Sequence, residues 1–411
     1  MGKGLSARFT RIIRMFDDRQ PQYGASDIAT MAARLARLDG AASDAERIDR
    51  IRRLEELKNA AAAAQARETA AFADSQTATT GRDRYRRGMT SQVALARRVS
   101  PFKAGQYVGW SQILVAELPH TFAELAAGRV TEWRAMLVAR ETAWLSREHR
   151  AVVDAELAPL LEKLGDRRTE AEAKKIAYRL DPHGYVDRIR NAAKDRRVSV
   201  RPAPDVMARL NALLPVAQGV AAYAALNRHA DSLISQGDPR SRGQIMADTL
   251  VERLTGQASA VDVPIEISLV MNADALLAEG DEPAHLDGYG PIPAQIARDI
   301  VGKPSEQTPM WIRRLFTRPR SSELAAMESR RRTFTGNQRR FVIARDQYCR
   351  TPYCEAPIRH IDHITPAEHG GPTSVDNAQG LCEACNYAKQ APGWRYQRES
   401  VTTPTGHTYA A

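Results

Sequence analysis

Residues 349–390 read C-RTPY-C-EAPIRHIDHITPAEHGGPTSVDNAQGL-C-EA-C-NYAKQ and hold the chain's dense cluster of cysteine, histidine, aspartate and asparagine. This stretch contains all four cysteines of the protein, as a CxxxxC pair (Cys349, Cys354) and a CxxC pair (Cys382, Cys385). Each pair can form a tight turn, and four converging thiolates are a usual ligand set for structural zinc. The alternative is four ordinary buried thiols, but packing alone gives no reason for them to gather in one stretch. We therefore predict a structural Zn²⁺ site.

The residues between and after the cysteine pairs predict a small folded module. A β-prone strand over 359–364 is followed by a loop, a second strand over 377–381 and a helix over 383–390. Gly370, Gly371 and Pro372 indicate a sharp turn in the loop. With so small a core, the zinc ion would supply much of the folding free energy.

This arrangement resembles the HNH endonuclease family, also called the ββα-metal nucleases. The resemblance is carried by the adjacent Asp362 and His363, by Asn377, and by Asn386 with Lys389 in CxxCNxxK. The GG-x-T turn that ends at Thr373 fits as well. The last position of the family motif is asparagine here instead of histidine, which is a variant of the family and changes the expected metal.

The residue types fit phosphodiester hydrolysis, which needs an activated water and a cation to take up developing negative charge. A neutral imidazole is a natural base near pH 7, so we assign His363 as the base. The resemblance implies that Asp362 and Asn386 hold the catalytic cation. Their two oxygen ligands favour Mg²⁺ first and Mn²⁺ next. It also implies that Asn377 ties down the loop and so orients His363, and that the products carry 5′-phosphate and 3′-hydroxyl ends.

Each of these side chains also has a plainer interpretation. Asp362 can cap a turn, and asparagines in loops usually bond the local backbone. His360, three residues before the base, is a strand residue, a supporting donor or a phosphate contact. His369, in the loop, is expected to be solvated.

Length and composition limit the function classes. A chain of 411 residues, 43% hydrophobic, allows two or three domains with a sizeable core. The net charge of +10 and the pI of about 9.6 suit a polyanionic partner and do not identify it. We expect no membrane span, because no run of 18 apolar residues occurs, and no secretory signal, so a cytoplasmic location is expected.

The predicted fold is mainly α: a large helical N-terminal domain with a small β-sheet, plus a C-terminal zinc-stabilised ββα-metal module. The expected segments are a loosely ordered start (1–42), the helical domain (43–300), a basic linker (301–333), the nuclease module (334–398) and a disordered tail (399–411).

The helical domain begins at a capping box, Ser43 with Glu46, and its first helix is expected to run to about residue 73. We expect this helix to pack on its own domain, with a coiled-coil dimer as the alternative, and residues 74–90 to form a loop. Later helices are expected at 147–164, 169–180, 182–197, 204–234 with a break at Pro215, and 240–255. Two strands, 198–201 and 264–270, are expected to pair.

One further helix pair could recognise a DNA sequence. Leu114 to Leu125 predicts one helix that Gly128 closes, and a second helix follows. This superficially fits a helix-turn-helix. However, Trp133, Leu137 and Trp144 read as core positions, which favours an ordinary antiparallel pair.

The middle of the chain carries a second resemblance. The segments ELPHTFAELAAGRVTEWRAMLVARE, GDPRSRGQIMADTLVERL and HLDGYGPIPAQIARDI look like a helical domain of uncharacterised function that precedes an HNH module in a large actinobacterial family. The match runs over roughly residues 90–300. It implies an architecture and no mechanism.

Residues 301–350 hold 12 Lys and Arg against 4 Asp and Glu, a net charge of +8. A short helix is expected near 311–316, and Thr335 is expected to cap a helix that continues through Arg345. Cationic side chains before a nuclease module can neutralise phosphates, and a solvated linker is the alternative. The expected nucleic-acid contacts are Arg330, Arg331, Arg332, Arg339, Arg340, Arg345 and, in the module itself, Lys389.

Two functions therefore compete. The first is a metal-dependent HNH endonuclease that hydrolyses DNA phosphodiester bonds with His363 activating water. The second is a non-catalytic zinc-dependent nucleic-acid-binding protein, and a scaffold built on the helical domain is a third. Target site, one-strand or two-strand cutting, RNA activity and oligomeric state stay open at this point.

Overall fold

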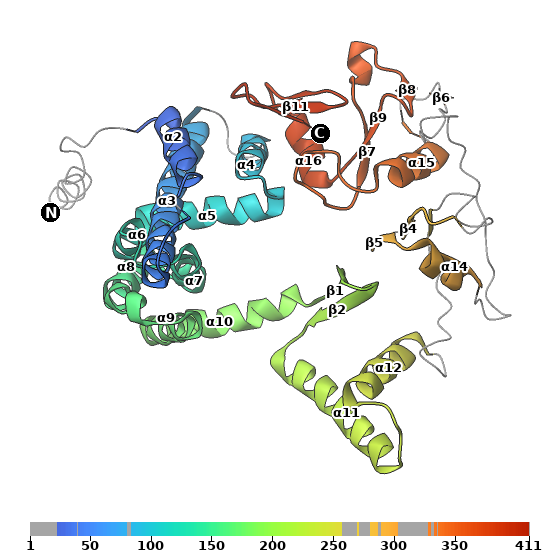
Figure 1. Cartoon of the computed structure of the whole chain (residues 1–411), viewed down its shortest axis with the longest axis horizontal. Helices are drawn as coiled ribbons and strands as arrows, with labels where there is room; N and C mark the ends of the chain where they lie inside the picture. Colours follow the sequence, from blue (N-terminus) through green and yellow to red (C-terminus); the bar gives the residue numbers. More distant parts are fainter. Residues whose placement is uncertain are drawn as a thin grey trace. The chain divides into compact units, whose positions relative to one another are not determined.

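A computed structural model describes residues 23–38, 40–79, 84–256, 269–270, 280–286, 289–302, 328–329, 333–334 and 336–410 (Figure 1). The chain divides into two compact units, residues 1–58 and 59–411. Helices dominate the described residues, the small sheets begin at residue 197, and a four-cysteine cluster lies toward the C-terminus, so the predicted fold class is confirmed. Within the described ranges, no helix combines the length and apolar character needed to cross a membrane.

The first unit contains α2 (Ala25–Leu35) and the beginning of α3 (Asp44–Thr79). The expectation that 1–42 is loosely ordered is wrong for α2, whose first turn is closed by Asp27 accepting from the Gly24 N–H at 2.7 Å. At the start of α3, the Glu46 N–H donates to Ser43 Oγ at 3.2 Å, as the capping box predicts.

Helix α3 buries different parts of its surface before and after Asn59. Ile48 and Ile51 are more than 60% exposed, whereas Ala63 and Ala73 are fully buried. The prediction that this helix packs on its own domain therefore holds only for its second half. The expected loop over 74–90 is wrong, because α3 continues to Thr79 and α4 (Arg84–Arg97) follows.

A bundle of helices forms the largest core. It comprises α5 (Pro101–Glu117), α6 (Pro119–Ala126), α7 (Glu132–Thr142), α8 (Arg147–Leu157), η1 (Ala158–Lys163) and α9 (Asp166–Leu180). Leu118, Leu125, Val138, Leu157 and Leu161 are fully buried in it. Ser and Thr side chains cap several of these helices, as at Ser100, Thr131 and Ser146.

The single helix expected from Leu114 to Leu125 is two helices. Pro119 disfavours helical geometry at the preceding residue, and Leu118 lies at φ −128°, ψ 57°. Gly128 closes α6 at φ 79°, as predicted. Trp133 is 47% exposed, so its assignment to the core is wrong, whereas Leu137 is buried and Trp144 packs against the bundle core.

A long hairpin follows α10 (Pro182–Ala192) and the short η2 (Ala193–Asp195). Its strands are β1 (Arg197–Ala203) and β2 (Met207–Leu213), and α11 (Val216–Ser235) and α12 (Arg242–Thr255) come next. The helix expected over 204–234 is therefore wrong in its first part, and the helix expected over 182–197 ends early.

The partner of the 198–201 strand is also corrected, because β1 pairs with β2. Of the expected 264–270 strand, 264–268 lie outside the described residues. The remainder, β3 (Leu269–Val270), pairs with β4 (Ala284–Leu286), which pairs with β5 (Gly290–Ile292) before α14 (Ala294–Gly302). The linker helix expected at 311–316 also lies outside the described residues.

Residues 336–410, called the C-terminal module here, contain the predicted strand, loop, strand and helix. After β6 (Glu328–Ser329) come α15 (Gly336–Asp346), β7 (His360–His363), η3 (Ala367–His369), β8 (Thr373–Ser374), β9 (Ala378–Leu381) and α16 (Glu383–Lys389). Strand β7 pairs antiparallel with β9, from His360 opposite Leu381 to His363 opposite Ala378.

The C-terminal tail was expected to be disordered, and this is wrong for its described residues. Strands β10 (Arg395–Tyr396), β11 (Ser400–Thr402) and β12 (Thr408–Ala410) form a three-stranded antiparallel sheet. Val401 on the central strand is buried and packs against Trp394.

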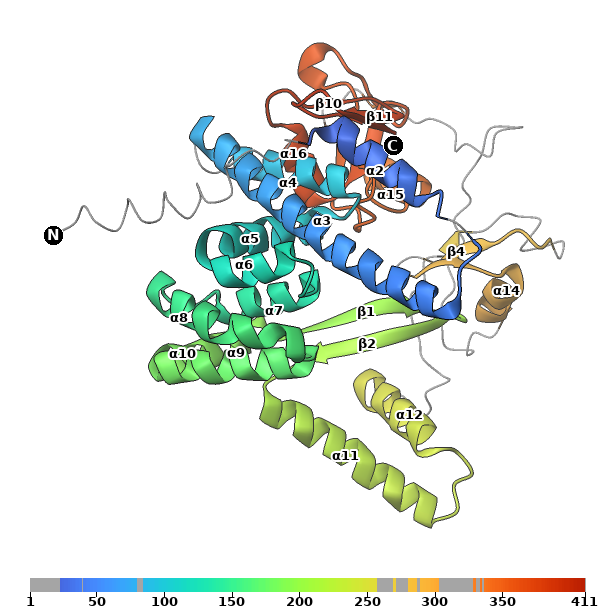
Figure 2. The same cartoon turned by 60° about the vertical axis from the view of Figure 1, so that its left-hand side comes forward.

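Helix α4 packs against the C-terminal module, and Figure 2 shows it beside α16. Leu95 of α4 shares a core with Ala391, Trp394 and Val401. The Thr405 hydroxyl donates to Gln92 Oε1 at 3.0 Å. A Cβ at Gly88 would lie 3.2 Å from both the Ala391 Cβ and the Trp394 Nε1, so glycine permits this close approach.

Candidate metal centre and active site

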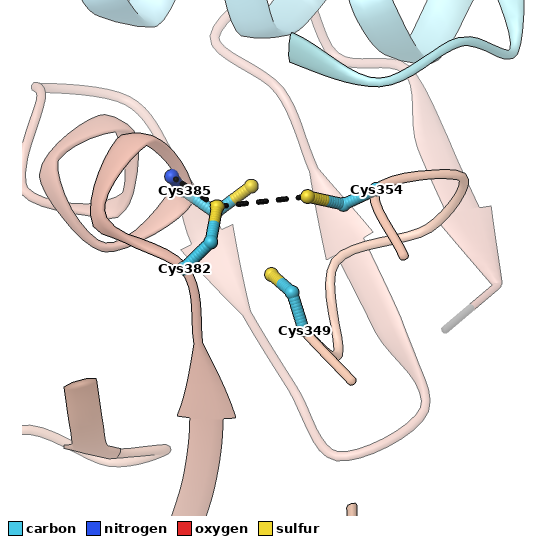
Figure 3. Close-up of side chains that lie close together, drawn as sticks. All are labelled: Cys349, Cys354, Cys382 and Cys385. Carbon is cyan, nitrogen blue, oxygen red and sulfur yellow. Dashed lines mark hydrogen bonds between the residues drawn. The ribbon is translucent and has the colours of Figure 1, made fainter. Parts of the chain in front are cut away.

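The four cysteines converge in the C-terminal module. Their Sγ atoms all lie within 4.8 Å of one another, and all four side chains are buried (Figure 3). In a tetrahedral zinc site with Zn–S bonds of about 2.3 Å, the sulfurs are roughly 3.8 Å apart, so this cluster can bind zinc. Among the described residues, no other group of three or more His, Cys, Asp and Glu side chains is close enough together to hold a metal ion.

Local backbone geometry brings the two pairs together. Cys382 is the N-cap of α16, and its sulfur accepts from the Cys385 N–H at 3.4 Å. The first pair lies on a loop closed by the Cys354 N–H donating to the Thr351 carbonyl at 3.1 Å. Tyr353 has a φ of 62°, a left-handed conformation that helps bend the chain between the two thiols.

Crowding makes the thiols ionise unequally. A hydrogen bond from Cys354, with others from Cys382 and Cys385, lowers the pKa of Cys349 below the usual thiol value. The pKa of Cys385 is raised, first by its hydrogen bond with Cys349 and further by burial. A cation that replaces the protons satisfies all four sulfurs together, which is the chemistry of a tetrathiolate site.

Asp362 and His363 lie at the end of β7. Asp362 Oδ2 accepts from Lys389 Nζ of α16 at 2.7 Å. The same ammonium donates to the main-chain carbonyls of His363 and Ile364. Lys389 therefore fixes the end of the strand to the helix that carries Cys385.

The His363 ring contacts a hydroxyl group and an aromatic ring. Its Nε2 lies 2.9 Å from Thr373 Oγ1 on β8. The Phe334 ring lies 4.6 Å from it, centroid to centroid, at a tilt of 40°. The imidazole is thus positioned by a hydroxyl and by an aromatic ring that precedes α15.

Asn377 bonds the loop between β7 and β8 at both ends. Its Oδ1 accepts from the Thr365 N–H at 2.9 Å, and its Nδ2 donates to the carbonyls of Thr365 and Pro372. Gly371 is required here, because a Cβ would lie 1.9 Å from the Thr365 oxygen. These contacts hold the loop that joins His363 to Thr373.

Asn386 is buried on α16, the residue after Cys385, and its Oδ1 has no hydrogen-bond partner in the described part of the chain. A buried amide oxygen without a donor is costly in free energy. An oxygen of this kind suits a cation as its partner.

A pocket of about 280 Å³ opens beside β7. It is lined by Thr333, Phe334, Arg339, Arg359, His360, Ile361 and His363. Arg339 and Arg359 are exposed residues, and Arg339 Nη2 donates to the Arg359 carbonyl at 3.1 Å. The pocket therefore combines two cations with the imidazole of His363, which suits an anionic group.

The comparisons with known proteins agree with this geometry. Residues 51–346 match the model described as "Domain of unknown function (DUF222)", which covers well over half of the chain. The chain belongs to the DUF222 family. Residues 347–391 match the model described as "HNH endonuclease". No curated protein and no solved structure matches the chain significantly.

In this DUF222 protein, the residues predicted as DNA contacts fall into three groups: those outside the described residues, those that are exposed, and those bonded within the module. Arg330, Arg331 and Arg332 lie outside the described residues, as does the expected cap Thr335. Arg340 is exposed on α15. The Arg345 guanidinium bonds Asp346 and the carbonyls of Val375 and Ala378, and the Lys389 side chain is only 10% exposed. These last two side chains are bonded to other groups of the module, and their predicted contact with DNA stays a prediction.

Three neighbours of the site were missed by sequence reasoning. Thr373 was recognised only as part of the GG-x-T turn, Arg359 only as part of a β-prone stretch, and Phe334 not at all. The adjacency of Arg359 to His360 is the one local signal that pointed to a cationic pocket wall. His369 is exposed, in line with its expected solvation, and the His360 ring lies 6.0 Å from the Tyr387 ring.

Proposed function

We propose that this DUF222 protein is a metal-dependent endonuclease that hydrolyses DNA phosphodiester bonds, with His363 activating the attacking water. The observation that carries the proposal is the support of one imidazole inside an HNH domain. His363 is contacted by Thr373 and Phe334, and Asn377 holds the loop between His363 and Thr373. A side chain with an ordinary surface role has no need of this support.

The proposed base acts through one tautomer of His363. Donation from Nε2 to Thr373 Oγ1 leaves the lone pair on Nδ1, which accepts the proton of the attacking water. The oxygen of that water forms the new bond to phosphorus as the bond to the 3′ oxygen breaks, which leaves 5′-phosphate and 3′-hydroxyl ends. Arg339 and Arg359 are placed to bind the phosphate at the pocket rim.

Asp362 and Asn386 are the proposed ligands of a catalytic Mg²⁺ or Mn²⁺. One feature of the described chain fits this assignment, because the buried Oδ1 of Asn386 lacks a hydrogen-bond partner among the described residues. When bound, the cation supplies charge stabilisation for the phosphate oxygens and the leaving group.

Zn²⁺ is the proposed occupant of the cluster of Cys349, Cys354, Cys382 and Cys385, and its role is structural. Four buried free thiols suit a reducing compartment, so the proposed location is cytoplasmic. The proposed partner is DNA, which the net charge of +10 favours.

A non-catalytic, zinc-dependent nucleic-acid-binding role is the second candidate, and one observation favours it. Lys389 engages the Asp362 carboxylate at 2.7 Å, so a cation must compete with an ammonium for this ligand. If the lysine keeps that place, the module holds its fold and can bind nucleic acid without hydrolysing it.

The deciding experiment is plasmid cleavage by the purified full chain with Mg²⁺ or Mn²⁺, followed by mapping of the product ends. His363→Ala is expected to lower the cutting rate by about 10²- to 10⁴-fold, the usual contribution of a general base. Zinc content is expected to stay stoichiometric, because the cysteines are untouched.

The matched control is His369→Ala, which removes an exposed imidazole from the neighbouring loop and is expected to cut like wild type. Equal cutting by wild type and His363→Ala would identify a contaminating nuclease. DNA binding without any metal-dependent cutting by the wild type would favour the second candidate.

A further inference from the structure

The β1–β2 hairpin, residues 197–213, forms an extended two-stranded ribbon (Figure 2). Each strand has seven residues, and each residue pairs with one opposite, from Arg197 with Leu213 to Ala203 with Met207. Directly paired residues of an antiparallel sheet lie on the same face, and faces alternate along a strand. The register therefore fixes which side chains share each face.

The two faces differ in chemistry. One face carries Arg197, Ser199 and Arg201 from β1 with Arg209 and Asn211 from β2, because Ser199 pairs with Asn211 and Arg201 with Arg209. The same face also carries the apolar residues Leu213, Ala203 and Met207. The opposite face is wholly apolar and includes Val198, Val200, Leu210 and Ala212. The first group is called the cationic face below.

The three arginines of the cationic face are exposed, and in the described part of the chain none of them has an ion-pair partner. Arginines of the helical bundle, in contrast, are often paired, as Arg134 is with Asp166 and Arg150 with Glu117. Arg201 lies directly opposite Arg209, a like-charge pair that costs stability. An anion bound between the two guanidinium groups would remove that cost.

The tip of the ribbon is anchored while its faces stay exposed. The Tyr289 hydroxyl donates to the Ala203 carbonyl at 2.8 Å. Val206, at the turn, packs in a small core with Ile292 and Ala297. A two-stranded hairpin alone is marginally stable in water, so this anchor helps to present the strands as a fixed element.

We propose that the cationic face binds duplex DNA by lying in the major groove. That groove is about 12 Å wide and admits a two-stranded ribbon. Arginine, asparagine and serine are side chains that bond base edges and phosphates there. Arg197 and Arg201 are four residues apart, roughly 14 Å along the strand, so the cationic face reaches several phosphates. The proposal deepens the proposed nuclease function by adding a DNA contact outside the catalytic module.

Duplex DNA suits the cationic face better than other nucleic acids do. Residues 197–213 contain no aromatic side chain, whereas binding of single strands relies on base stacking against aromatic rings. The major groove of A-form RNA is deep and narrow and does not admit such a ribbon. The helix pair α6 and α7 is a poorer reader, because α7 buries Ala135, Leu137 and Val138.

The test compares DNA affinity in the full chain carrying His363→Ala, so that cutting cannot disturb the measurement. A fluorescent duplex is titrated by anisotropy over a range of salt concentrations. Arg197→Gln/Arg201→Gln/Arg209→Gln is expected to weaken binding at least about tenfold. The logarithm of the binding constant falls with the logarithm of the salt concentration. The steepness of this slope is expected to decrease by about 2 to 3, the value for three lost phosphate contacts.

Two further variants, each with three substitutions, serve as controls for the loss of charge and for folding. Arg167→Gln/Arg168→Gln/Arg253→Gln removes the same charge from exposed positions of α9 and α12 and is expected to bind almost like the parent. Arg197→Lys/Arg201→Lys/Arg209→Lys keeps the charge and is expected to restore most of the salt slope. If the lysine triple binds as weakly as the glutamine triple, charge is not the cause and the proposal fails.

The proposal is also overturned if the ribbon glutamine triple binds duplex DNA as tightly as the charge-matched control. A loss confined to RNA or to single-stranded DNA has the same consequence. Because the readout is binding and not cutting, the result does not depend on which residue activates the water. Wild-type cleavage can fail while this test succeeds, and the reverse also holds.

Discussion

The C-terminal module and the helical bundle use different means to hold their folds. Around the cysteines, the core of the module consists of the four thiols and Leu381. The core of the bundle is a continuous set of aliphatic side chains, including Leu125, Val153 and Leu161. Small cores contribute little stability on their own, so we expect the module to depend on a bound metal ion that the bundle does not need.

The largest expected effect comes from removing a zinc ligand, which should unfold the module and leave the bundle folded. Cys385→Ser takes away the most deeply buried sulfur, and we expect loss of stoichiometric zinc, unfolding of the module and loss of DNA cutting. Metal analysis together with hydrogen exchange checks this. Exchange in α7 and α8 should stay slow, because their core contains no cysteine. A variant that keeps full zinc and a protected α16 would show that the module stands on its own packing.

The converse change tests the bundle. Leu157 is fully buried, and Leu157→Ala is expected to lower the free energy of unfolding by about 2 to 5 kcal/mol. Leu160→Ala, at a neighbouring leucine that is 46% exposed, is the control and should cost less than about 0.5 kcal/mol. Urea titration gives both values. Zinc content should not change in either variant, and its loss in Leu157→Ala would mean that the two regions are not independent.

The smallest effect concerns the support of the proposed base. Thr373→Val removes the hydroxyl that contacts His363 Nε2 while keeping the shape of the side chain. We expect a roughly fivefold slower cutting rate, in keeping with about 1 kcal/mol for one hydrogen bond. A shifted pH profile is expected as well, because the imidazole loses a partner. Thr408→Val, on the exposed strand β12, is the control. An unchanged rate and pH profile in Thr373→Val would remove Thr373 from the site.

The module was predictable because its information is local. Four cysteines at fixed spacings and an Asp-His pair identify a short motif, and the structure contains the expected strands, helix and sulfur cluster. The contact between His363 and Thr373 was not predictable, because it depends on the path of the loop that Asn377 and Gly371 fix. The roles of Asp362, His363, Asn377 and Asn386 stay predictions.

The ribbon was the principal failure of sequence reasoning. Residues 207–213 read MARLNAL and consist mostly of good helix formers, so local propensity favours a helix. Pairing with β1 across the turn at Asp205 and Val206, both at positive φ, overrides that preference. The prediction of a disordered tail was wrong for a similar reason. Its strands are held by Trp394 and by Leu95 of α4, a residue remote in sequence.

The packing of α4 on the C-terminal module has a consequence for dissecting or recombining this protein. The two matched family segments meet between residues 346 and 347, yet one hydrophobic core contains residues from both sides of that junction, Leu95 and Trp394. A truncated chain starting there would expose Trp394 and Val401 to water and should tend to aggregate. Transferring the HNH segment into another protein would therefore require α4, or a substitute for Leu95 and Gln92, to be transferred with it.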